Sequence, residues 1–489
     1  MTAFDRRICA VLLACVCVLT PTGATASAAG ADPIASVDAY TPRLNQLARQ
    51  IWDAAELGYQ ETASSALLQR ELKAAGFKVQ AGVAGMPTAF IARAGRAAGG
   101  PVIAVLAEMD ALPGVSQAAL PQRQPITGKD AGHACGHNLF GAGSVAAALA
   151  VKQWLDASGQ PGEVRVYGAP AEEGGSGKVF LVKAGLFEDV DVVLHWHPHA
   201  SNSAAQNTAL ANVSGKFRFH GVAAHAAASP ERGRSALDGV EALNAMVNLM
   251  REHVPQDVRI HYVITAGGKA PNVVPPEAEV YYYVRHQDPE VAKTVMARVR
   301  KAAEGAAMGT ETQVTYQPIG GTYNLLPNDV LGRAMDAQLR RVGGVRYSAQ
   351  DTAFAEQLRQ SLDNPPPLAQ AAEIEPYAVG QVTHHSTDVG DVSWVVPTVG
   401  LGTATWVPGT AAHSWQAVAA SGSHIGYQGA AVAAKVIALT ATELFAHPQL
   451  IAQAKAEFDQ RRGANFHYHS LLDRDTPALD YRRLGTSSD

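Results

Sequence analysis

The feature that most constrains the fold is an alternation of short apolar runs with longer helical patterns. Residues 102–107, 164–168 and 190–194 are apolar runs of strand length, and each lies next to a segment with helical periodicity. Such alternation is typical of parallel strands joined by crossover helices that cover the sheet. The sequence therefore predicts an α/β fold with a mixed, mostly parallel sheet and helices on both faces.

Helical segments are recognised by apolar residues that recur every three or four positions. This periodicity is found through much of the chain and predicts the helices that would cover the sheet. We expect helices over residues 41–55, 61–75, 144–157, 235–252, 289–306, 328–341 and 423–445.

A different pattern begins near Ala211. Residues 213–220, 258–266 and 279–285 alternate between apolar and polar side chains, as strands with one solvated face do. Two of the predicted helices are interleaved with these strands, which gives a β-α-β-β-α unit. We therefore predict a small α+β domain inserted in the larger one.

The length of the chain agrees with two domains. A chain of 489 residues is longer than a single compact core usually serves. The polar end of the chain, from Phe458, matches no interpretable pattern and is consistent with a flexible tail. We assign residues 35–207 and 324–450 to the larger domain, 208–323 to the inserted domain and 451–489 to a C-terminal extension.

Residues 1–28 have the pattern of a signal peptide. Arg6 and Arg7 precede an apolar run, and small residues around Ala26 offer cleavage sites. The run is shorter than the about 20 residues that a membrane span needs, so no transmembrane anchor is expected after cleavage. We therefore expect an exported protein, periplasmic or secreted. A buried N-terminal helix and a lipid attached at Cys15 are the alternatives.

Cleavage would leave only one of the four cysteines, Cys135, because the other three lie in the leader. An exported protein with a single thiol has no internal disulfide, and a free thiol in an oxidising compartment is a liability. Cys135 therefore needs a partner that stabilises its thiol.

The formal net charge of −5 argues against a general binder of nucleic acid.

Five short segments concentrate the residue types that bind metals. Three of them follow predicted strands, and ligands of an open α/β sheet collect outside the carboxyl ends of its strands. Cysteine, histidine and glutamate together suit Zn²⁺, and carboxylates also suit Mn²⁺. The segments are residues 107–113, 133–138, 170–175, 195–199 and 412–415.

The adjacent residues Glu172 and Glu173 allow one carboxylate to bind a metal while the other serves as a base. Each motif also has a plainer interpretation. A pair of glutamates is most often solvated, a buried cysteine is usually inert packing, and Asp110 can simply cap a helix. The other nearby histidines are not expected to be ligands, namely His133, His195, His199, His384 and His385.

These segments lie within long signatures that resemble the amidohydrolase branch of the co-catalytic metallopeptidases, which includes aminoacylase and carboxypeptidase G. The resemblance extends from about residue 51 to residue 445. It implies a di-metal exopeptidase domain with an inserted ferredoxin-like domain for dimerisation or as a lid. The signatures are GHACGHNLFGAGSVAAALAVK, GAPAEEGGSGKVF, GVAAHAAASPERGRSALD, APNVVPPEAEVYYYVR and STDVGDVSWVVPT.

The resemblance implies two divalent metal ions, Zn or Mn, in the larger domain. It makes Cys135 the ligand that bridges them, Glu172 the general base and Asp110 the acid that orients a ligand imidazole. The other ligands that it implies are His137, Glu173, His197 and His413.

The resemblance also assigns residues of the inserted domain to the site. His225 matches a histidine that reaches the site of a neighbouring subunit and stabilises the oxyanion. Asn272 and Arg285 match positions that hold the carboxylate or carbonyl of the substrate. These assignments imply a homodimer, or a hetero-oligomer with a related subunit.

The implied activity is metal-dependent hydrolysis of the amide bond of an N-acyl or N-aroyl amino acid, such as p-aminobenzoyl-glutamate. A water between the metals would attack, with Glu172 as the base. An exported dipeptidase or aminoacylase of broader specificity, and a non-catalytic metal- or ligand-binding paralogue, stay open. Glu108 stands where the branch often has Asp, and the signal peptide departs from relatives that are generally cytoplasmic.

Overall fold

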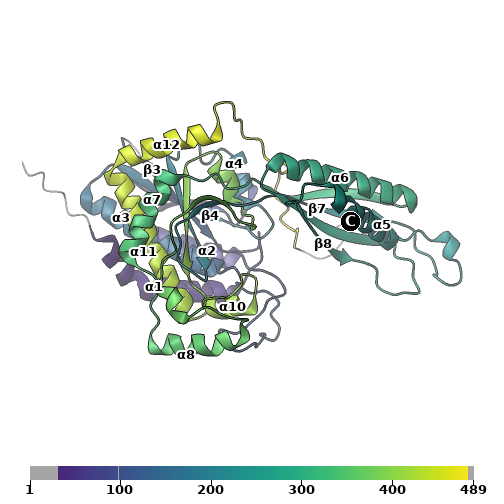
Figure 1. Cartoon of the computed structure of the whole chain (residues 1–489), viewed down its shortest axis with the longest axis horizontal. Coiled ribbons are helices and arrows are strands. Elements are labelled where there is room, and N and C mark those ends of the chain that lie inside the picture. Colours follow the sequence, from purple (N-terminus) through teal and green to yellow (C-terminus); the bar gives the residue numbers. More distant parts are fainter. Residues whose placement is uncertain (1–30, 97–98, 483–489) are drawn as a thin grey trace, which may run out of the picture.

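The computed structural model describes residues 31–96 and 99–482, so the expected signal peptide and its cysteines lie outside the described residues. The described chain forms a large domain on a six-stranded sheet and an arm on a four-stranded sheet (Figure 1). The order of the large sheet is β1-β2-β4-β3-β5-β12. Its strands are β1 Lys78–Ala81, β2 Phe90–Arg96, β3 Val102–Glu108, β4 Gly162–Ala169, β5 Val192–His199 and β12 Thr398–Ala404.

Strand β3 lies inside this sheet and is buried along its whole length. It runs parallel to β4 and β5, and β12 runs parallel to β5, while β1 and β2 are antiparallel additions. Because successive side chains of a strand point to opposite faces, its complete burial means that both faces are covered. The prediction of a mixed, mostly parallel sheet with helices on both faces is confirmed.

The helices of the large domain pack around this sheet, and α1, α3 and α11 contact one another. Helix α11 is long and apolar enough to cross a membrane, but 78% of its most apolar window is buried inside the protein, so core packing explains its composition. The helices are α1 Pro33–Ala54, α2 Thr62–Ala74, α3 His137–Ser158, α4 Gly177–Lys183, α7 Asp329–Val342, α8 Ala349–Leu358, α9 Val389–Ser393, α10 Trp415–Ser421, α11 His424–Ala446 and α12 Pro448–Arg462.

The inserted domain forms the arm in Figure 1 and has its own apolar core. Its antiparallel strands have the order β10-β7-β9-β8, and α5 and α6 pack on them. In chain order this is β-α-β-β-α-β, which is the ferredoxin-like arrangement. The elements are β7 Ala211–His220, α5 Ala236–Met250, β8 Arg259–Ala266, β9 Glu277–His286, α6 Pro289–Gly309 and β10 Gln313–Thr322. A small parallel sheet lies outside this unit and consists of β6 Gln206–Thr208 and β11 Val379–Val382.

The chain after α12 is not a free tail over its described part. Residues 463–482 run from α12 to the junction between the two sheets (Figure 1). The hydroxyl of Tyr468 donates to the carboxylate of Asp391 (2.7 Å), and the guanidinium of Arg474 donates to the carbonyl of Pro318 (3.2 Å). The expectation of a flexible tail is wrong for this segment, because its anchoring contacts follow no periodic pattern that the sequence displays.

The burial of β3 predicts a large effect of shortening one of its side chains. Leu106 is fully buried, so Leu106→Ala should lower the free energy of unfolding by about 2–5 kcal/mol, through lost contacts and a cavity. Leu120 is 43% exposed, and Leu120→Ala should change it by less than about 0.5 kcal/mol. Urea unfolding followed by circular dichroism measures both. Equal effects would contradict the assignment of β3 to the core.

Candidate metal centre

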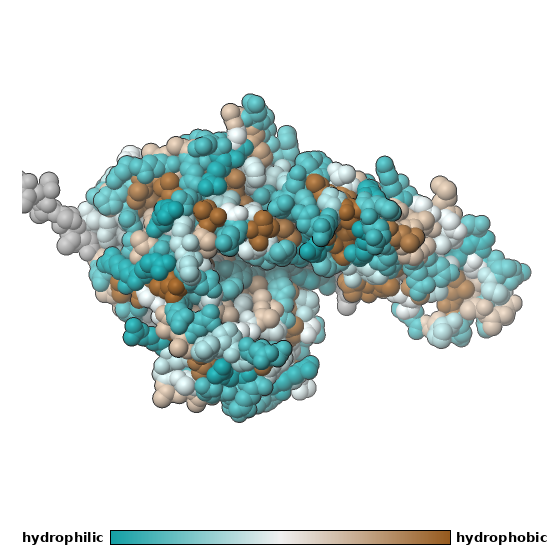
Figure 2. Space-filling view, viewed as in Figure 1, coloured by the Kyte–Doolittle hydropathy of each residue, from teal (hydrophilic) through white to brown (hydrophobic). Residues whose placement is uncertain are grey.

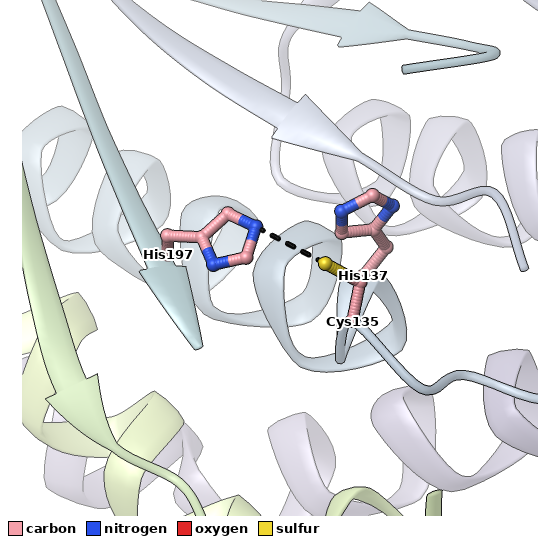
Figure 3. Close-up of side chains that lie close together, drawn as sticks. All are labelled: Cys135, His137 and His197. Carbon is pink, nitrogen blue, oxygen red and sulfur yellow. Dashed lines mark hydrogen bonds between the residues drawn. The ribbon is translucent and has the colours of Figure 1, made fainter. Parts of the chain in front are cut away.

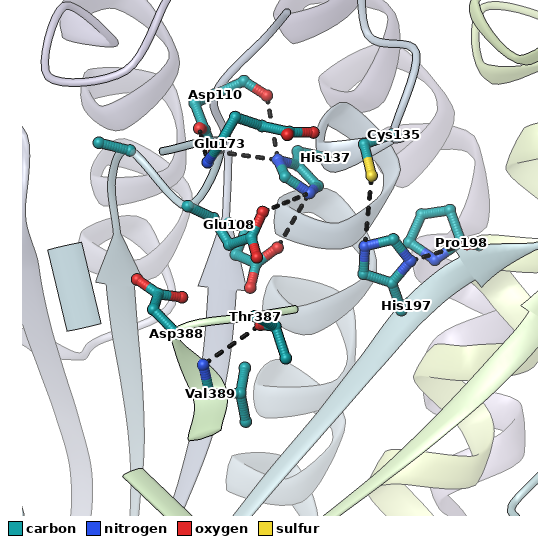
Figure 4. Close-up of polar contacts among 12 residues, drawn as sticks. Glu108, Asp110, Cys135, His137, Glu173, His197, Pro198, Thr387, Asp388 and Val389 are labelled. Atoms are coloured by element: carbon teal, nitrogen blue, oxygen red, sulfur yellow. Dashed lines mark hydrogen bonds and ion pairs between the residues drawn. The ribbon is translucent and has the colours of Figure 1, made fainter. Parts of the chain in front are cut away.

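The side chains predicted to bind metal converge at the carboxyl ends of the parallel strands. Figure 4 shows four of them, Cys135, His137, Glu173 and His197. Strand β3 leads to Asp110, β4 leads to the loop that holds Glu172 and Glu173, and β5 carries His197 near its end. His137 is the first residue of α3. Parallel strands end at the same edge of a sheet, so the loops that follow them meet there.

Cys135 lies between two groups of potential ligands. Its sulfur shares one group with His137 and His197, whose ligand atoms lie within 4.8 Å of one another (Figure 3). It shares a second group of the same spacing with Glu173 and His413. The sulfur lies 3.6 Å from Nε2 of His197. A third group joins His137 to Glu108 and Glu172. A thiolate sulfur common to two groups has the position that a ligand bridging two metal ions would occupy.

Asp110 makes hydrogen bonds with two of these potential ligands. One of its carboxylate oxygens lies 2.9 Å from Nδ1 of His137, and the other accepts a hydrogen bond from the backbone amide of Glu173 (2.9 Å). The first contact leaves Nε2 of the imidazole for a metal. Carboxylates in this position fix the orientation of a ligand imidazole and raise its basicity.

The donor atoms of the site fit divalent transition-metal ions. Within residues 31–96 and 99–482, Nε2 of His137, Oε2 of Glu108 and Oε1 of Glu173 are buried without a hydrogen-bonding partner, although the first two lie 3.0 Å apart. Buried polar atoms that lack partners are unfavourable, and a cation would satisfy them. Nitrogen, sulfur and carboxylate oxygen are the donors that such ions prefer.

The electrostatics of the cluster separate the two adjacent glutamates. Burial and the neighbouring carboxylates of Glu108 and Glu173 raise the pKa of Glu172 well above its usual value. Burial also opposes ionisation of Glu173, but His413, with its Nε2 3.4 Å away, lowers the pKa of Glu173 to about 2. Glu173 is therefore ionised and placed to bind a cation, whereas Glu172 can hold a proton.

The thiol and the first imidazole also have shifted pKa values. Burial and the charge of Glu173 raise the pKa of Cys135 well above its usual value, so this thiol ionises only with a strong stabilising partner. Burial alone would lower the pKa of His137, but the carboxylates of Glu108 and Asp110 outweigh it and raise that pKa. Nearby carboxylates contribute to both shifts, and negative charge around a site favours cations there.

Sequence reasoning missed a buried lysine next to the site. Lys178 is fully buried, and its Nζ lies 2.7 Å from Glu108 and 2.6 Å from Asp388. Burial opposes its charge, but the carboxylates of Asp388 and Glu108 outweigh this and raise its pKa. The signal in the sequence was a lysine among apolar residues, at the second position of the short helix α4. A buried charge needs a partner, so this lysine indicated an acid nearby.

Two glycines allow α3 to bring His137 to the site. Helix α3 begins at His137, earlier than the periodicity predicts, because glycine weakens the helical pattern of its first turns. A β-carbon on Gly143 would lie 2.8 Å from the side chain of Trp196, and one on Gly141 would lie 2.8 Å from the carbonyl of Glu108. The glycines therefore let α3 lie closely against β3 and β5.

The predicted residues of the inserted domain are not brought together with the ligands. His225 and Asn272 are exposed, and in the described part of the chain no hydrogen bond or ion pair joins their side chains to a ligand. Arg285 lies closer to the large domain. Its guanidinium contacts the hydroxyl of Ser386 (3.4 Å) and lies over the ring of Tyr283 (5.4 Å).

The histidines that flank His197 lie outside the ligand groups found among the described residues. The ring of His195 packs against Gly400, where a β-carbon would come within 2.3 Å of it. The Nδ1 atom of His199 lies 3.0 Å from the hydroxyl of Ser201.

Comparison with known proteins places this site in a family. The family described as peptidase family M20/M25/M40 matches residues 104–330. The chain is 40% identical over 452 residues to one subunit of the p-aminobenzoyl-glutamate hydrolase of Escherichia coli (strain K12), which covers 87% of this chain and 94% of the relative. It is 32% identical over 436 residues to the Xaa-Arg dipeptidase of Mus musculus, which covers 86% of this chain and 90% of the relative.

A solved structure has the same fold. The crystal structure of a dinuclear metal-binding peptidase of the M20 family from Bacillus subtilis matches with a TM-score of 0.53 at 19% identity, over 84% of this chain and 99% of that chain. At this identity the similarity shows the fold alone, while the relative from Escherichia coli is similar over nearly its whole length. The chain therefore belongs to the M20/M25/M40 peptidase family and is an amidohydrolase of that family.

Proposed function

We propose that this protein hydrolyses the amide bond of an N-acyl or N-aroyl amino acid, such as p-aminobenzoyl-glutamate, with two divalent metal ions, Zn or Mn. The observation that carries the proposal is that the thiol of Cys135 belongs to two potential ligand groups, while Glu172 belongs to a third, with Glu108 and His137, beside them. The name of the Escherichia coli relative, a p-aminobenzoyl-glutamate hydrolase, supports the substrate class.

Metal ions bound to these ligands would polarise the amide carbonyl and lower the pKa of water. The chain itself supplies the proton transfer. Oε2 of Glu172 lies 4.0 Å from Nε2 of His137. The carboxylate therefore faces the proposed ligands but makes no hydrogen bond with His137. Glu172 takes a proton from the attacking water and returns it to the leaving nitrogen. Its raised pKa suits a group that must both accept and release a proton.

Arg285 is the residue that would bind the carboxylate of the substrate. Its Nε is buried and has no hydrogen-bonding partner within the described residues, and its only hydrogen bond there is the long contact with Ser386. A guanidinium with free donors binds a carboxylate through two parallel hydrogen bonds. This supports substrates whose leaving group is an amino acid with a free carboxylate.

His225 would act at the site of a neighbouring subunit, and it is exposed in this chain. Asn272, which would hold the substrate, lies beside it, since its carbonyl accepts a hydrogen bond from the amide of Ala226 (3.1 Å). The space-filling view shows the inserted domain as an arm with exposed hydrophobic side chains (Figure 2). Strand β8 lies at the edge of its sheet, where a strand of a second chain can pair with it. It exposes three apolar side chains, namely Tyr262, Val263 and Ile264.

We propose a homodimer, or a hetero-oligomer with a related chain. The second arrangement is supported by the Escherichia coli hydrolase, whose two different subunits are both similar to this chain.

Residues 1–28 would direct export to the periplasm or beyond. Their arginine pair, apolar run and small residues support this location. Bound metal ions would then protect the thiol of Cys135 from oxidation in that compartment.

The assignment of the base predicts the effect of Glu172→Gln. The variant should lose at least about 100-fold in kcat, because an amide cannot accept the proton of the attacking water. Its metal content should equal that of the wild type, since all the proposed ligands remain. Hydrolysis of p-aminobenzoyl-glutamate, N-acetyl amino acids and dipeptides, after metal analysis, measures both effects.

A matched control for this variant is Glu231→Gln, because the side chain of Glu231 is 71% exposed. The control should keep the wild-type rate. Wild-type turnover by Glu172→Gln with metals bound would refute the base assignment. If the wild type with both metals bound hydrolyses no amide, the proposed function is wrong.

The proposal that His225 acts across a dimer predicts complementation. The homodimers of His225→Ala and of Glu172→Gln should each be impaired at least about 100-fold. A heterodimer of the two, purified through different tags, has one site with Glu172 and the partner's intact histidine, so about half of the wild-type activity should return. A heterodimer as inactive as its parents would contradict a role in the neighbouring site.

A further inference from the structure

The C-terminal segment, residues 463–482, reaches the candidate metal centre. The hydroxyl of Tyr481 donates a hydrogen bond to the backbone carbonyl of Glu173 (3.2 Å), and the guanidinium of Arg482 donates to the same oxygen. Two donors from the far end of the chain therefore meet on the backbone of a proposed metal ligand. Neither residue lies within the signatures that carry the family resemblance.

Tyr481 is held firmly in this position. Its side chain is buried, and its ring lies edge-on to the ring of Tyr59, with 5.8 Å between the centroids. The hydroxyl of Tyr59 in turn donates to the carbonyl of Gly175 (2.5 Å). A β-carbon on Gly58 would lie 2.6 Å from the hydroxyl of Tyr481, so the chain leaves little space around it. The tyrosine pair therefore packs directly against the loop that carries the two glutamates.

This loop needs support from outside itself. Ala171 and Ser176 have positive φ angles of 57° and 58°, a region that costs a non-glycine residue about 1–2 kcal/mol. Such conformations persist only where the surroundings fix them.

Side chains from other elements fix this backbone from its amide side. The amide of Ala171 donates to the buried carboxylate of Glu61 (2.8 Å), and the amide of Glu173 donates to Asp110 (2.9 Å). Tyr481 and Arg482 hold the opposite side of the Glu173 residue, its carbonyl.

We propose that Tyr481 and Arg482 are positioning residues that complete the metal centre. With Asp110 on its amide and these two donors on its carbonyl, the Glu173 backbone is fixed at both ends, and so are the directions of the Glu172 and Glu173 side chains. The inference rests on the proposed role of Glu173 as a metal ligand. Residues that orient metal ligands typically change metal affinity by about 10- to 100-fold when they are replaced.

The test compares the full protein with the double variant Tyr481→Phe/Arg482→Met. Isothermal titration of the metal-free proteins with Zn²⁺ should show affinity weakened by about 10- to 100-fold in the variant. At saturating metal, kcat should fall while KM stays within about twofold, since the residues act through Glu173 rather than on the substrate. Arg482→Lys, which keeps a charged donor, should bind Zn²⁺ more tightly than Arg482→Met.

The control is Arg462→Met, because Arg462 makes a local contact with Asp459 at the end of α12. The double variant and the control should have similar melting temperatures without metal. If the double variant melts lower, Tyr481→Phe alone, which removes one oxygen atom, should still weaken Zn²⁺ binding.

Unchanged Zn²⁺ affinity in Tyr481→Phe and in the double variant would overturn the proposal. A higher KM with unchanged kcat and affinity would also overturn it and would make Arg482 a substrate contact. The binding comparison needs no substrate. If the wild type binds Zn²⁺ but hydrolyses no amide, the proposed function fails while the positioning role is still decided.

Discussion

The balance of buried charge at the ends of β3, β4 and β5 is the constraint on which the rest of this structure depends. Glu108, Glu172 and Glu173 come together there with little exposure to water. Burying carboxylates is unfavourable unless positive charge accompanies them. Lys178 supplies one such charge at Glu108, and the imidazoles face the others. Oε2 of Glu108, Nε2 of His137 and Oε1 of Glu173 are buried without a hydrogen-bonding partner among the described residues, and bound cations would complete this balance of charge.

The same constraint explains why distant segments meet at one loop. The loop between β4 and α4 must present two adjacent carboxylates in different directions, and it does so with residues of positive φ. Such a backbone does not hold itself, so Glu61 at the start of α2, Asp110 after β3 and the C-terminal Tyr481 each bond to it. Stability and function are therefore coupled in this loop, because the contacts that fix its backbone also aim its side chains.

Much of the architecture was predictable because local sequence patterns indicate it. Apolar runs next to helical segments predict β4, β3 and β5, three neighbouring strands of the large sheet, but not β1, β2 or β12. Alternating runs predict most of the inserted sheet. Strand β10 was not predicted, because Pro318 and two following glycines interrupt its alternation. The start of α3 was missed because Gly141 and Gly143, which its close packing requires, weaken the helical signal. At the start of α3, the error occurs where packing outweighs local propensity.

The sequence by itself determined the fold class, the metal-binding residue types at the strand ends and the family to which they belong. Only the tertiary structure decided that the thiol of Cys135 lies in two ligand groups, that Lys178 neutralises Glu108, and that Tyr481 reaches the backbone of Glu173. The physical reason is that strands, helices and motifs arise from neighbouring residues, whereas buried charges and strained loops are satisfied by partners hundreds of residues away, which no local pattern reveals.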